Sequence, residues 1–329
     1  MSAIARQQET MATASRVRRV LIVNNPAAGR PAAHRAVTRL AQRLRQLQWQ
    51  VDVAGTDYQG HATELTAQAV SQGFALVVAA GGDGTINEVI QSLAGSPTAL
   101  GVLPVGTANV WAADTGIPAD PDALAALLDR GAASSIDVGR AGSRYFLLMA
   151  GVGFDAAVVQ GLQPDLKRRV GRWAYAVTAA NLARHYAGTS MRLRLDGVEL
   201  RHTVLMLVIG NTRRYAGSFR LTPNAMVDDG RLDVCIVPGS RLLRSPAQTG
   251  AVLTGAPLLR RALHCRQAAS IEIDAAQPLP VQLDGDFAGW TPLHVEAVPG
   301  ALRVVVPKQR ANGLFRYQLA EERRSSVCG

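Results

Sequence analysis

Short apolar runs alternate with helix-like stretches through the first third of the chain, and this alternation constrains the fold more than any other feature of the sequence. Strands are predicted at residues 20–25, 49–56, 74–82 and 99–107, and helices at residues 32–48, 61–72 and 87–93. Strands that alternate with helices are typical of a parallel sheet covered on both faces. We therefore predict an N-terminal three-layer α/β domain over residues 18–135.

The second part of the chain, residues 136–307, is predicted to be a β-rich domain. Strand-like pieces occur at residues 137–140, 145–154, 192–197, 204–211, 231–238, 271–275, 279–286 and 302–307, with helical interruptions at 166–186 and 241–266. Residues 1–17 are polar and lack the apolar core of a signal peptide, so a disordered extension is expected there. Residues 308–329 are expected to form a C-terminal tail.

The charge of the chain is uneven and points to an anionic partner. The formal net charge is +10, and residues 160–270 hold seventeen Lys and Arg against six Asp and Glu, a local net charge of +11. A basic surface attracts anionic lipid, nucleic acid or an acidic substrate, and charge alone does not choose among them. Aromatic residues make up only 5% of the chain, which disfavours a stacking surface for single-stranded nucleic acid.

The three cysteines, Cys235, Cys265 and Cys328, are widely spaced and form no CxxC pair. This spacing predicts neither a zinc site nor a disulfide framework, and it fits a reducing cytoplasm. The sequence contains no run of about 18 apolar residues, so no membrane-spanning helix is expected.

A glycine-rich segment at residues 81–88 lies directly between a predicted apolar strand and a predicted helix. Its residues are Gly81, Gly82, Asp83, Gly84, Thr85, Ile86, Asn87 and Glu88. Glycines at such a position let backbone N–H groups approach phosphate oxygens, and a helix N-terminus favours negative charge. The spacing matches neither a Walker A loop nor GxGxxG. The alternative interpretation is an ordinary glycine turn in which Asp83 caps the helix.

Two further turns follow neighbouring predicted strands. One consists of Asn25, Pro26, Ala27, Ala28 and Gly29, and the other, residues 104–109, contains Thr107. Either turn alone is more often structural than functional. In open parallel sheets, however, ligands bind outside the carboxyl ends of the strands, so three converging loops predict a binding site there.

Five segments in this order resemble the diacylglycerol kinase catalytic-domain family, which includes bacterial lipid kinases, sphingosine kinases and ceramide kinases. They are NPAAG (25–29), GGDGTINEV (81–89), LPVGTAN (103–109), AGVGFDA (150–156) and LDGD (283–286). GGDG alone is shared with NAD kinases and phosphofructokinases. The resemblance implies a nucleotide-binding α/β domain and a C-terminal β-sandwich-like domain, with the active site between them. It also implies that residues 25–29, 81–88 and Thr107 contact ATP, together with Thr56 after the second strand.

The resemblance further implies the catalytic residue. The family pattern ends in Asp-Gly-Glu, and its last acidic residue is the usual acceptor of the hydroxyl proton. In this chain that position is Asp286, one methylene shorter, and Asp284 is the other candidate. Phosphoryl transfer to an alcohol benefits from such a carboxylate. The alternative interpretation is a hairpin turn at Asp284-Gly285.

Residues 228–233 resemble the family segment that binds Mg²⁺ away from the reacting phosphate. Position by position, the resemblance assigns the Asp229 side chain and the carbonyl groups of Met226 and Arg231 as ligands. One carboxylate with carbonyl oxygens suits Mg²⁺, which retains several water molecules. A solvated turn between strands is the alternative.

Basic residues beside aromatic rings suggest contact with lipid headgroups. Lys167, Arg168, Arg169 and Arg172 precede a predicted helix with Trp173, Tyr175 and Tyr186, and a second basic group comprises Arg260, Arg261 and Arg266. Such combinations suit an anionic interface. A solvated helix face with its rings in the core is an equal alternative.

The leading hypothesis is a lipid kinase that uses ATP and Mg²⁺ to phosphorylate a hydroxyl of a diacylglycerol-like or sphingoid lipid. We expect a cytoplasmic protein in peripheral contact with an anionic membrane, acting in lipid metabolism. One alternative is an NAD kinase-like phosphotransferase. Another is a basic nucleotide-binding module without catalysis; Asp83 and Asp286 argue against nucleic acid as its partner, because carboxylates repel polyanions. The sequence leaves open which lipid is used and whether the protein is a homodimer.

Overall fold

The computed structural model describes residues 18–26, 31–162, 173–183, 185–215, 219–239, 264–307 and 313–316. The N-terminal part is built on four parallel strands in the order β2-β1-β3-β4. These strands are β1 (Arg19–Asn24), β2 (Gln50–Gly55), β3 (Leu76–Gly81) and β4 (Ala99–Pro104). Strand β3 is buried along its whole length, as expected for a central strand covered on both faces. The predicted parallel sheet is confirmed.

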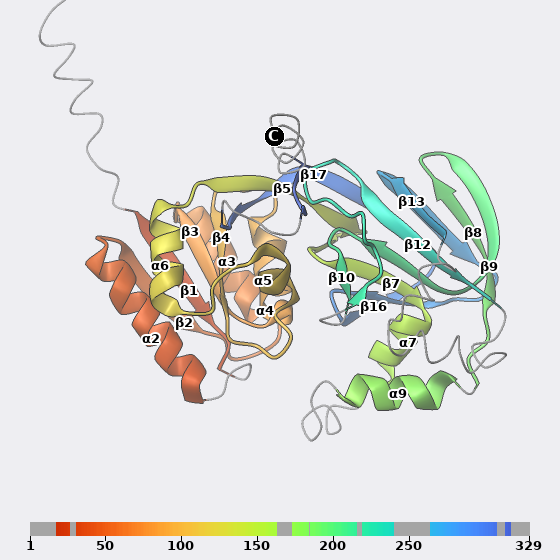
Figure 1. Ribbon diagram of the computed structural model, residues 1–329, viewed down its shortest axis with the longest axis horizontal. Coiled ribbons are helices and arrows are strands. Elements are labelled where there is room, and N and C mark those ends of the chain that lie inside the picture. Colours follow the sequence, from red (N-terminus) through yellow and green to blue (C-terminus); the bar gives the residue numbers. More distant parts are fainter. Residues whose placement is uncertain are drawn as a thin grey trace, which may run out of the picture.

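Helices cover this sheet in two groups (Figure 1). The helices are α2 (Pro31–Gln46), α3 (His61–Ser71), α4 (Asp83–Leu93), α5 (Val110–Thr115) and α6 (Pro121–Arg130). Helix α2 packs on α6, and α3 packs on α4. The sequence did not predict α5 and α6, and it began α4 at Asn87 instead of Asp83. The first turn of α4 contains Gly84, a residue of low helix propensity, which hid the true start of the helix.

The C-terminal part consists mainly of antiparallel strands, so the prediction of an α/β part followed by a β-rich part is confirmed. Its strands are β5 (Ala133–Ala141), β6 (Arg144–Phe146), β7 (Met149–Gly153), β8 (Thr189–Leu195), β9 (Val198–Gly210), β10 (Arg214–Tyr215), β11 (Phe219–Arg220), β12 (Leu232–Pro238), β13 (His264–Ala268), β14 (Ser270–Ala275), β15 (Pro280–Leu283), β16 (Asp286–Trp290) and β17 (Leu293–Val305). Two helices, α7 (Phe154–Gln160) and α9 (Trp173–Ala183), lie along one side of these strands (Figure 1).

The two parts share one hydrogen-bonded network of strands. Strand β17 pairs in parallel with β4 through Val304 and Leu100, and β5 pairs with β17 in antiparallel fashion. Strand β5 runs without a break across residues 135 and 136, where the domain boundary was predicted. The boundary therefore stays a prediction, because no interruption of the chain marks it.

Two local expectations of the β-rich part need correction. The strand expected at 145–154 is two strands, β6 and β7, followed by α7, which begins at Phe154. The helix expected at 241–266 ends in residues that belong to β13; the rest of that range lies outside the described residues. Most of β13 is exposed and polar, so it carries no apolar alternation that could reveal a strand.

A disulfide joins Cys235 and Cys265, so the expectation of no disulfide was wrong for this pair. The two residues are 30 positions apart in the sequence, but they lie directly opposite each other on the antiparallel strands β12 and β13. Their Cα atoms are 4.1 Å apart. The spacing of cysteines in the sequence did not reveal this register.

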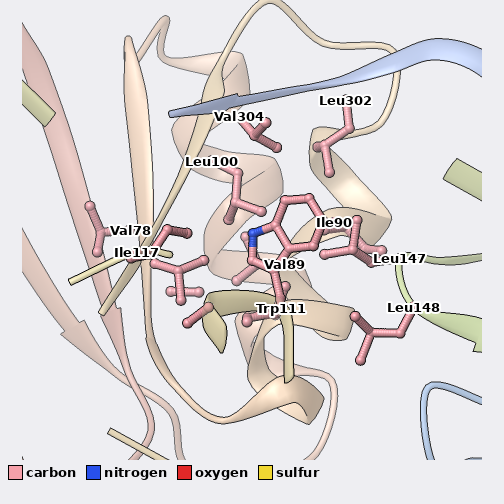
Figure 2. Packing of buried hydrophobic residues seen from close by; sticks show 14 of the residues in the cluster. Val78, Val89, Ile90, Leu100, Trp111, Ile117, Leu147, Leu148, Leu302 and Val304 are labelled. Atoms are coloured by element: carbon pink, nitrogen blue, oxygen red, sulfur yellow. The ribbon is translucent and has the colours of Figure 1, made fainter. Parts of the chain in front are cut away.

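One hydrophobic core crosses from the α/β part into the β-rich part. Figure 2 shows Trp111 of α5 packed among side chains from both parts. Its neighbours in this cluster include Ile90 and Leu100 from the α/β part, and Leu147 and Val304 from the β-rich part. The shared core joins the two parts, and residues of both parts therefore lie near the candidate site. None of the described helices is long and apolar enough to cross a bilayer.

Candidate functional site

The glycine-rich segment forms the junction between β3 and α4. Gly82 is the N-cap of α4 in extended conformation, and its carbonyl oxygen accepts a hydrogen bond from Ile86 at 3.2 Å. The first N–H groups of a helix have no partner within the helix and carry its positive end. A Cβ atom built on Gly84 would meet no heavy atom within 4 Å. The first turn of α4 is therefore open to a ligand on the side of Gly84.

The loop after β4 packs main chain against main chain on this junction. The N–H of Gly106 donates to the carbonyl oxygen of Gly81 at 3.2 Å. A Cβ atom on Gly106 would collide with the Cα of Gly82, so this close approach requires glycine. The two loops that the sequence proposed as phosphate-binding are thus in direct contact.

Asp83 connects the loops after β3 and β4 through hydrogen bonds. Its carboxylate accepts hydrogen bonds from the N–H groups of Val110 at 3.1 Å and Trp111 at 3.3 Å, at the start of α5. Burial raises the pKa of the Asp83 carboxyl, and these two donors oppose that shift. The proposed role of Asp83 as a helix cap is therefore realised, but on α5 and not on its own helix.

The loop after β1 reaches the junction through Asn25. The Asn25 side-chain amide donates to Thr85 Oγ1 at 3.2 Å, and Thr85 is buried. Thr56 directly follows β2, and its N–H donates to the carbonyl oxygen of Asn24 at 2.9 Å. The carboxyl ends of the four parallel strands thus gather the predicted residues at one edge. Thr107 is exposed beside Gly106; Ala27, Ala28 and Gly29 lie outside the described residues.

Three residues of segment 81–88 point away from this edge. The Ile86 side chain lies in the hydrophobic core. The Glu88 carboxylate accepts a hydrogen bond from the N–H of Ala62, at the start of α3. The buried Asn87 side chain donates to a carboxylate of the β-rich part. Helix periodicity causes this division, since consecutive residues of a helix face different directions.

The LDGD segment forms a tight hairpin between β15 and β16. Asp284 and Gly285 occupy its two turn positions with φ values of 50° and 92°. Asp-Gly suits such a turn because both positions require positive φ. The hairpin turn that the sequence offered as an alternative is therefore present. Asp286 is the first residue of β16 after the turn.

The Asp284 carboxylate is surrounded by donors. It accepts hydrogen bonds from the N–H groups of Leu147, Leu148 and Met149 and from the Asn87 amide, at 2.8 to 2.9 Å. Burial raises its pKa to about 6, although all four donors favour the ionised form. This carboxylate is committed to holding the turn in place.

Asp286 is in a different situation. Its side chain is half-buried and has no hydrogen-bond or ion-pair partner in the part of the chain that the structure describes. A carboxylate without a protein partner keeps its lone pairs available for an incoming hydroxyl. Of the two carboxylates, Asp286 is therefore the better placed to accept a proton.

Sequence reasoning missed two residues, Gln282 and Asp155, that hold the hairpin turn through hydrogen bonds. Gln282 Oε1 accepts a hydrogen bond from the N–H of Gly285 at 2.7 Å, and Gln282 Nε2 donates to Asp155 Oδ2 at 2.7 Å. Both side chains are buried. A Cβ atom on Gly151 would collide with the Asp155 carboxylate, so glycine there makes room for the pair. A Gln between two apolar residues in a fully buried strand was the available signal.

The proposed magnesium ligands lie in a turn before β12. Asp229 Oδ1 accepts from the N–H of Arg231 at 3.0 Å, and Asp229 Oδ2 accepts from Gln267 at 3.3 Å. Burial raises the pKa of Asp229, and the neighbouring carboxylate of Asp137 raises it further. Met226 is half-buried three residues before Asp229. No group of three or more acidic, His or Cys side chains forms a metal cluster among the described residues.

Most of the basic residues proposed to meet lipid headgroups lie outside the described residues, including 167–169, Arg172, Arg260 and Arg261. Arg266 is exposed on β13. The ring of Tyr186 packs edge-on against buried Phe154 with centroids 5.1 Å apart, and burial raises its pKa to about 12. Tyr186 therefore belongs to the core, as the alternative interpretation held.

Several arginines of segment 160–270 are neutralised within the molecule. The ion pairs are Arg192–Asp274, Arg194–Glu272, Arg201–Glu199, Arg214–Asp114 and Arg231–Asp196. Paired side chains attract an anionic surface less than free ones do, because the two charges cancel at a distance. At least five of the seventeen Lys and Arg residues of the segment are therefore paired with carboxylates.

Known proteins share both parts of the chain. Residues 19–141 match the family described as diacylglycerol kinase catalytic domain, and residues 149–306 match the YegS C-terminal NAD kinase beta sandwich-like domain. A probable lipid kinase YegS-like from Pseudomonas putida is 36% identical over 281 residues, covering 85% of this chain and 93% of that protein. A diacylglycerol kinase from Bacillus subtilis is 28% identical over 302 residues, covering 91% and 99%.

A solved structure has the same fold. The crystal structure of a putative diacylglycerol kinase from Bacillus anthracis superimposes with a TM-score of 0.76, covering 90% of this chain and 97% of that one. The two sequences are 24% identical, so this likeness concerns the fold alone.

Proposed function

The chain belongs to the diacylglycerol kinase catalytic-domain family, and we propose that it transfers a phosphoryl group from ATP to the hydroxyl of a diacylglycerol-like or sphingoid lipid. One observation carries this proposal: Asn87 of α4 donates to Asp284 across 197 positions of sequence. Asn87 lies one helical turn beyond Asp83, and Asp284 is two residues before Asp286. A glycine-rich helix start and a candidate base thus meet across the junction of the two parts.

The residues at the carboxyl ends of the strands suit a nucleotide triphosphate. The open side of Gly84 and the N–H groups of the first turn of α4, which have no partner within the helix, would receive phosphate oxygens, as helix N-termini commonly do. Asn25, Thr56 and Thr107 border the same edge and would contact the rest of the nucleotide. When bound there, ATP supplies the phosphoryl group that is transferred.

We assign the proton-accepting role to Asp286. The four donors around Asp284 hold the hairpin, and Gln282 fixes the N–H of Gly285 from the other side. Such support keeps a catalytic side chain in one place, which is most of what phosphoryl transfer requires of a protein. Asp284 and Gln282 are then positioning residues, and Asp286 takes the hydroxyl proton.

The donor set around Asp229 fits Mg²⁺. It offers a partly buried carboxylate beside a second carboxylate, Asp137, and carbonyl oxygens of the turn, all of them oxygen ligands. Asp229 with the carbonyl groups of Met226 and Arg231 would hold the ion. Bound Mg²⁺ supplies positive charge that holds this turn together. A second ion that accompanies ATP would offset the charge of the transferred phosphate.

The experiment that tests the function is transfer of labelled phosphate from ATP to a panel of lipid alcohols in mixed micelles, with NAD as a parallel acceptor. We expect label in a diacylglycerol-like or sphingoid lipid, and loss of transfer when divalent ions are chelated, because the phosphate charge is then left without an offset. Label in NAD and in no lipid would contradict the proposal and support the NAD kinase alternative. If no acceptor is labelled, the kinase proposal fails and the remaining hypothesis is a nucleotide-binding module without catalysis.

Replacing Asp229 by Ala is expected to lower the melting temperature. The difference should shrink when Mg²⁺ is chelated from both proteins, and only the part due to the lost hydrogen bonds from Arg231 and Gln267 should remain. The reason is mass action, since an ion bound only to the folded chain stabilises it. Thermal unfolding with and without chelator measures this. Glu272→Ala, at an exposed ion pair, is the matched control and should shift the melting temperature equally in both conditions. The contrary result is that Mg²⁺ raises the melting temperature of Asp229→Ala and of the wild type by the same amount. In that case the Asp229 cluster is a solvated turn and not a magnesium site.

The proposal places the reaction at a membrane surface on the cytoplasmic side, with the protein in peripheral contact and without a nucleic-acid partner. The acceptor is a lipid, and a lipid presents its hydroxyl at the boundary between the acyl region and water. The net positive charge supports attraction to anionic lipid.

A further inference from the structure

Strand β16 exposes a pair of large aromatic side chains directly after Asp286. Phe287 is 40% exposed and Trp290 is 50% exposed. Their ring centroids are 5.9 Å apart in an edge-to-face arrangement. By contrast, Trp49 and Trp111 are 7% and 1% exposed. In a chain with so few aromatic residues, two adjacent exposed rings form an unusual surface, which we call the aromatic pair.

A β-bulge brings the two rings to the same face of the strand. Residues three apart in a regular strand point to opposite faces, because side chains alternate. Here Gln282 pairs with Phe287 and Val281 pairs with Gly289, so Ala288 is an extra residue in β16. One extra residue shifts the alternation by one position and re-aims the following side chains. The aromatic pair is thus a product of the backbone of this hairpin.

The hairpin leaves the pair uncovered. Strand β16 is an edge strand that pairs with β15 alone within the described ranges. It lies on the side of the β-rich part that faces the α/β part (Figure 1). Asp286 begins the same strand, one residue before Phe287. Side chains alternate along a strand, so the aromatic pair lies beside Asp286 along β16 but on the opposite face.

We propose that Phe287 and Trp290 insert into the interfacial layer of the lipid surface that contains the acceptor, and thereby hold Asp286 at the depth of the lipid hydroxyl. Trp and Phe combine a large apolar area with few rotatable bonds, and Trp prefers the boundary between headgroups and acyl chains. The part of this proposal that concerns Asp286 rests on the proposed function, whereas insertion of the two rings into a lipid surface is independent of it.

Charge distinguishes this contact from the attraction expected of the basic segment. No Lys or Arg lies between Arg266 and Arg303, and the only charges of the hairpin itself are Asp284 and Asp286. The aromatic pair therefore has no nearby cation in the sequence with which to attract anionic headgroups. Its insertion should be driven by burial of apolar area, so it should occur on uncharged vesicles and persist when salt screens exposed charges.

The first test uses vesicles of phosphatidylcholine with brominated acyl chains at high salt. We expect them to bind the full chain and quench its tryptophan fluorescence, because bromine quenches only rings that enter the bilayer. Trp290→Phe should keep most of the binding and lose most of the quenching. The double variant Phe287→Ser with Trp290→Ser should bind at least about tenfold more weakly, since burying one such ring contributes a factor of this order.

Val198→Ser is the matched control. Val198 is 58% exposed on β9, and the same loss of an exposed apolar side chain there should change neither binding nor quenching. Melting temperatures of all variants show whether they are folded. Wild-type protein that binds without quenching, or a folded double variant that binds as tightly as wild type, would overturn the proposal.

Activity and oligomeric state separate the remaining outcomes. With the acceptor in a bilayer, the double variant should lose at least about tenfold more activity than with a short-chain acceptor dispersed in water. If wild type quenches but phosphorylates no lipid, the docking surface stands and the proposed function fails. The last outcome is a wild-type dimer in sedimentation, a monomeric double variant and no quenching. In that case the aromatic pair is an interface between two copies of the chain, and our proposal is wrong.

Discussion

Replacing Asp286 by Asn is expected to lower the rate of phosphoryl transfer by about 10²–10⁴-fold while leaving ATP affinity nearly unchanged. The amide has almost the same shape as the carboxylate but does not accept a proton. Because Asp286 has no protein partner among the described residues, the change leaves no donor unpaired and should not disturb the fold. Transfer of labelled phosphate and equilibrium binding of ATP measure the two quantities separately.

Two companion variants decide whether the assignment to Asp286 is correct. Asp286→Glu should retain activity, because it restores the side-chain length of the family pattern. Asp284→Asn should lower the melting temperature, because its new NH₂ group faces backbone N–H groups that now donate to the carboxylate. If Asp286→Asn keeps more than about half of its activity and Asp284→Asn is inactive with an unchanged melting temperature, the base is Asp284 and our assignment is wrong.

Replacing Gly84 by Val is expected to weaken ATP binding by about a hundredfold while the protein remains folded. A Cβ atom at Gly84 meets nothing within 4 Å, so the backbone there leaves space for a branched side chain to begin. It would occupy the space through which phosphate approaches the first turn of α4. Loss of one or two charge-assisted hydrogen bonds, at about 1.5–3 kcal/mol each, corresponds to this change. Calorimetric titration with ATP measures the affinity.

Gly106→Ala is the control for glycine loss in the same region. Its Cβ atom would collide with the backbone of Gly82, so this variant should lose stability, seen as a lower melting temperature. Gly84→Val should not. A folded Gly84→Val protein that binds ATP as tightly as wild type would remove the first turn of α4 from the nucleotide site, whatever Gly106→Ala does.

The alternation of apolar strands and helices could be predicted from the sequence, because apolar residues recur with a short and characteristic spacing in each type of element. Strands β1 to β4 and helices α2 and α3 lie within a few residues of their predicted ranges. Helices α5 and α6 were missed because α5 is short and α6 follows a loop rich in Pro and Asp. The segments that carry the family resemblance were also readable, since each of them is continuous in sequence.

The sequence by itself determined the α/β sheet, the glycine-rich helix start at its edge and the candidate carboxylates. Only the tertiary structure decided what each of them does. Asp284 holds the hairpin, Asp286 has no partner among the described residues, and Cys235 is bonded to Cys265. The physical reason is the distance along the sequence over which each feature acts. Helix and strand periods are local, so a window of a few residues contains them. The partner of Asn87 is 197 positions away, and no local pattern states which distant donor will satisfy a buried carboxylate.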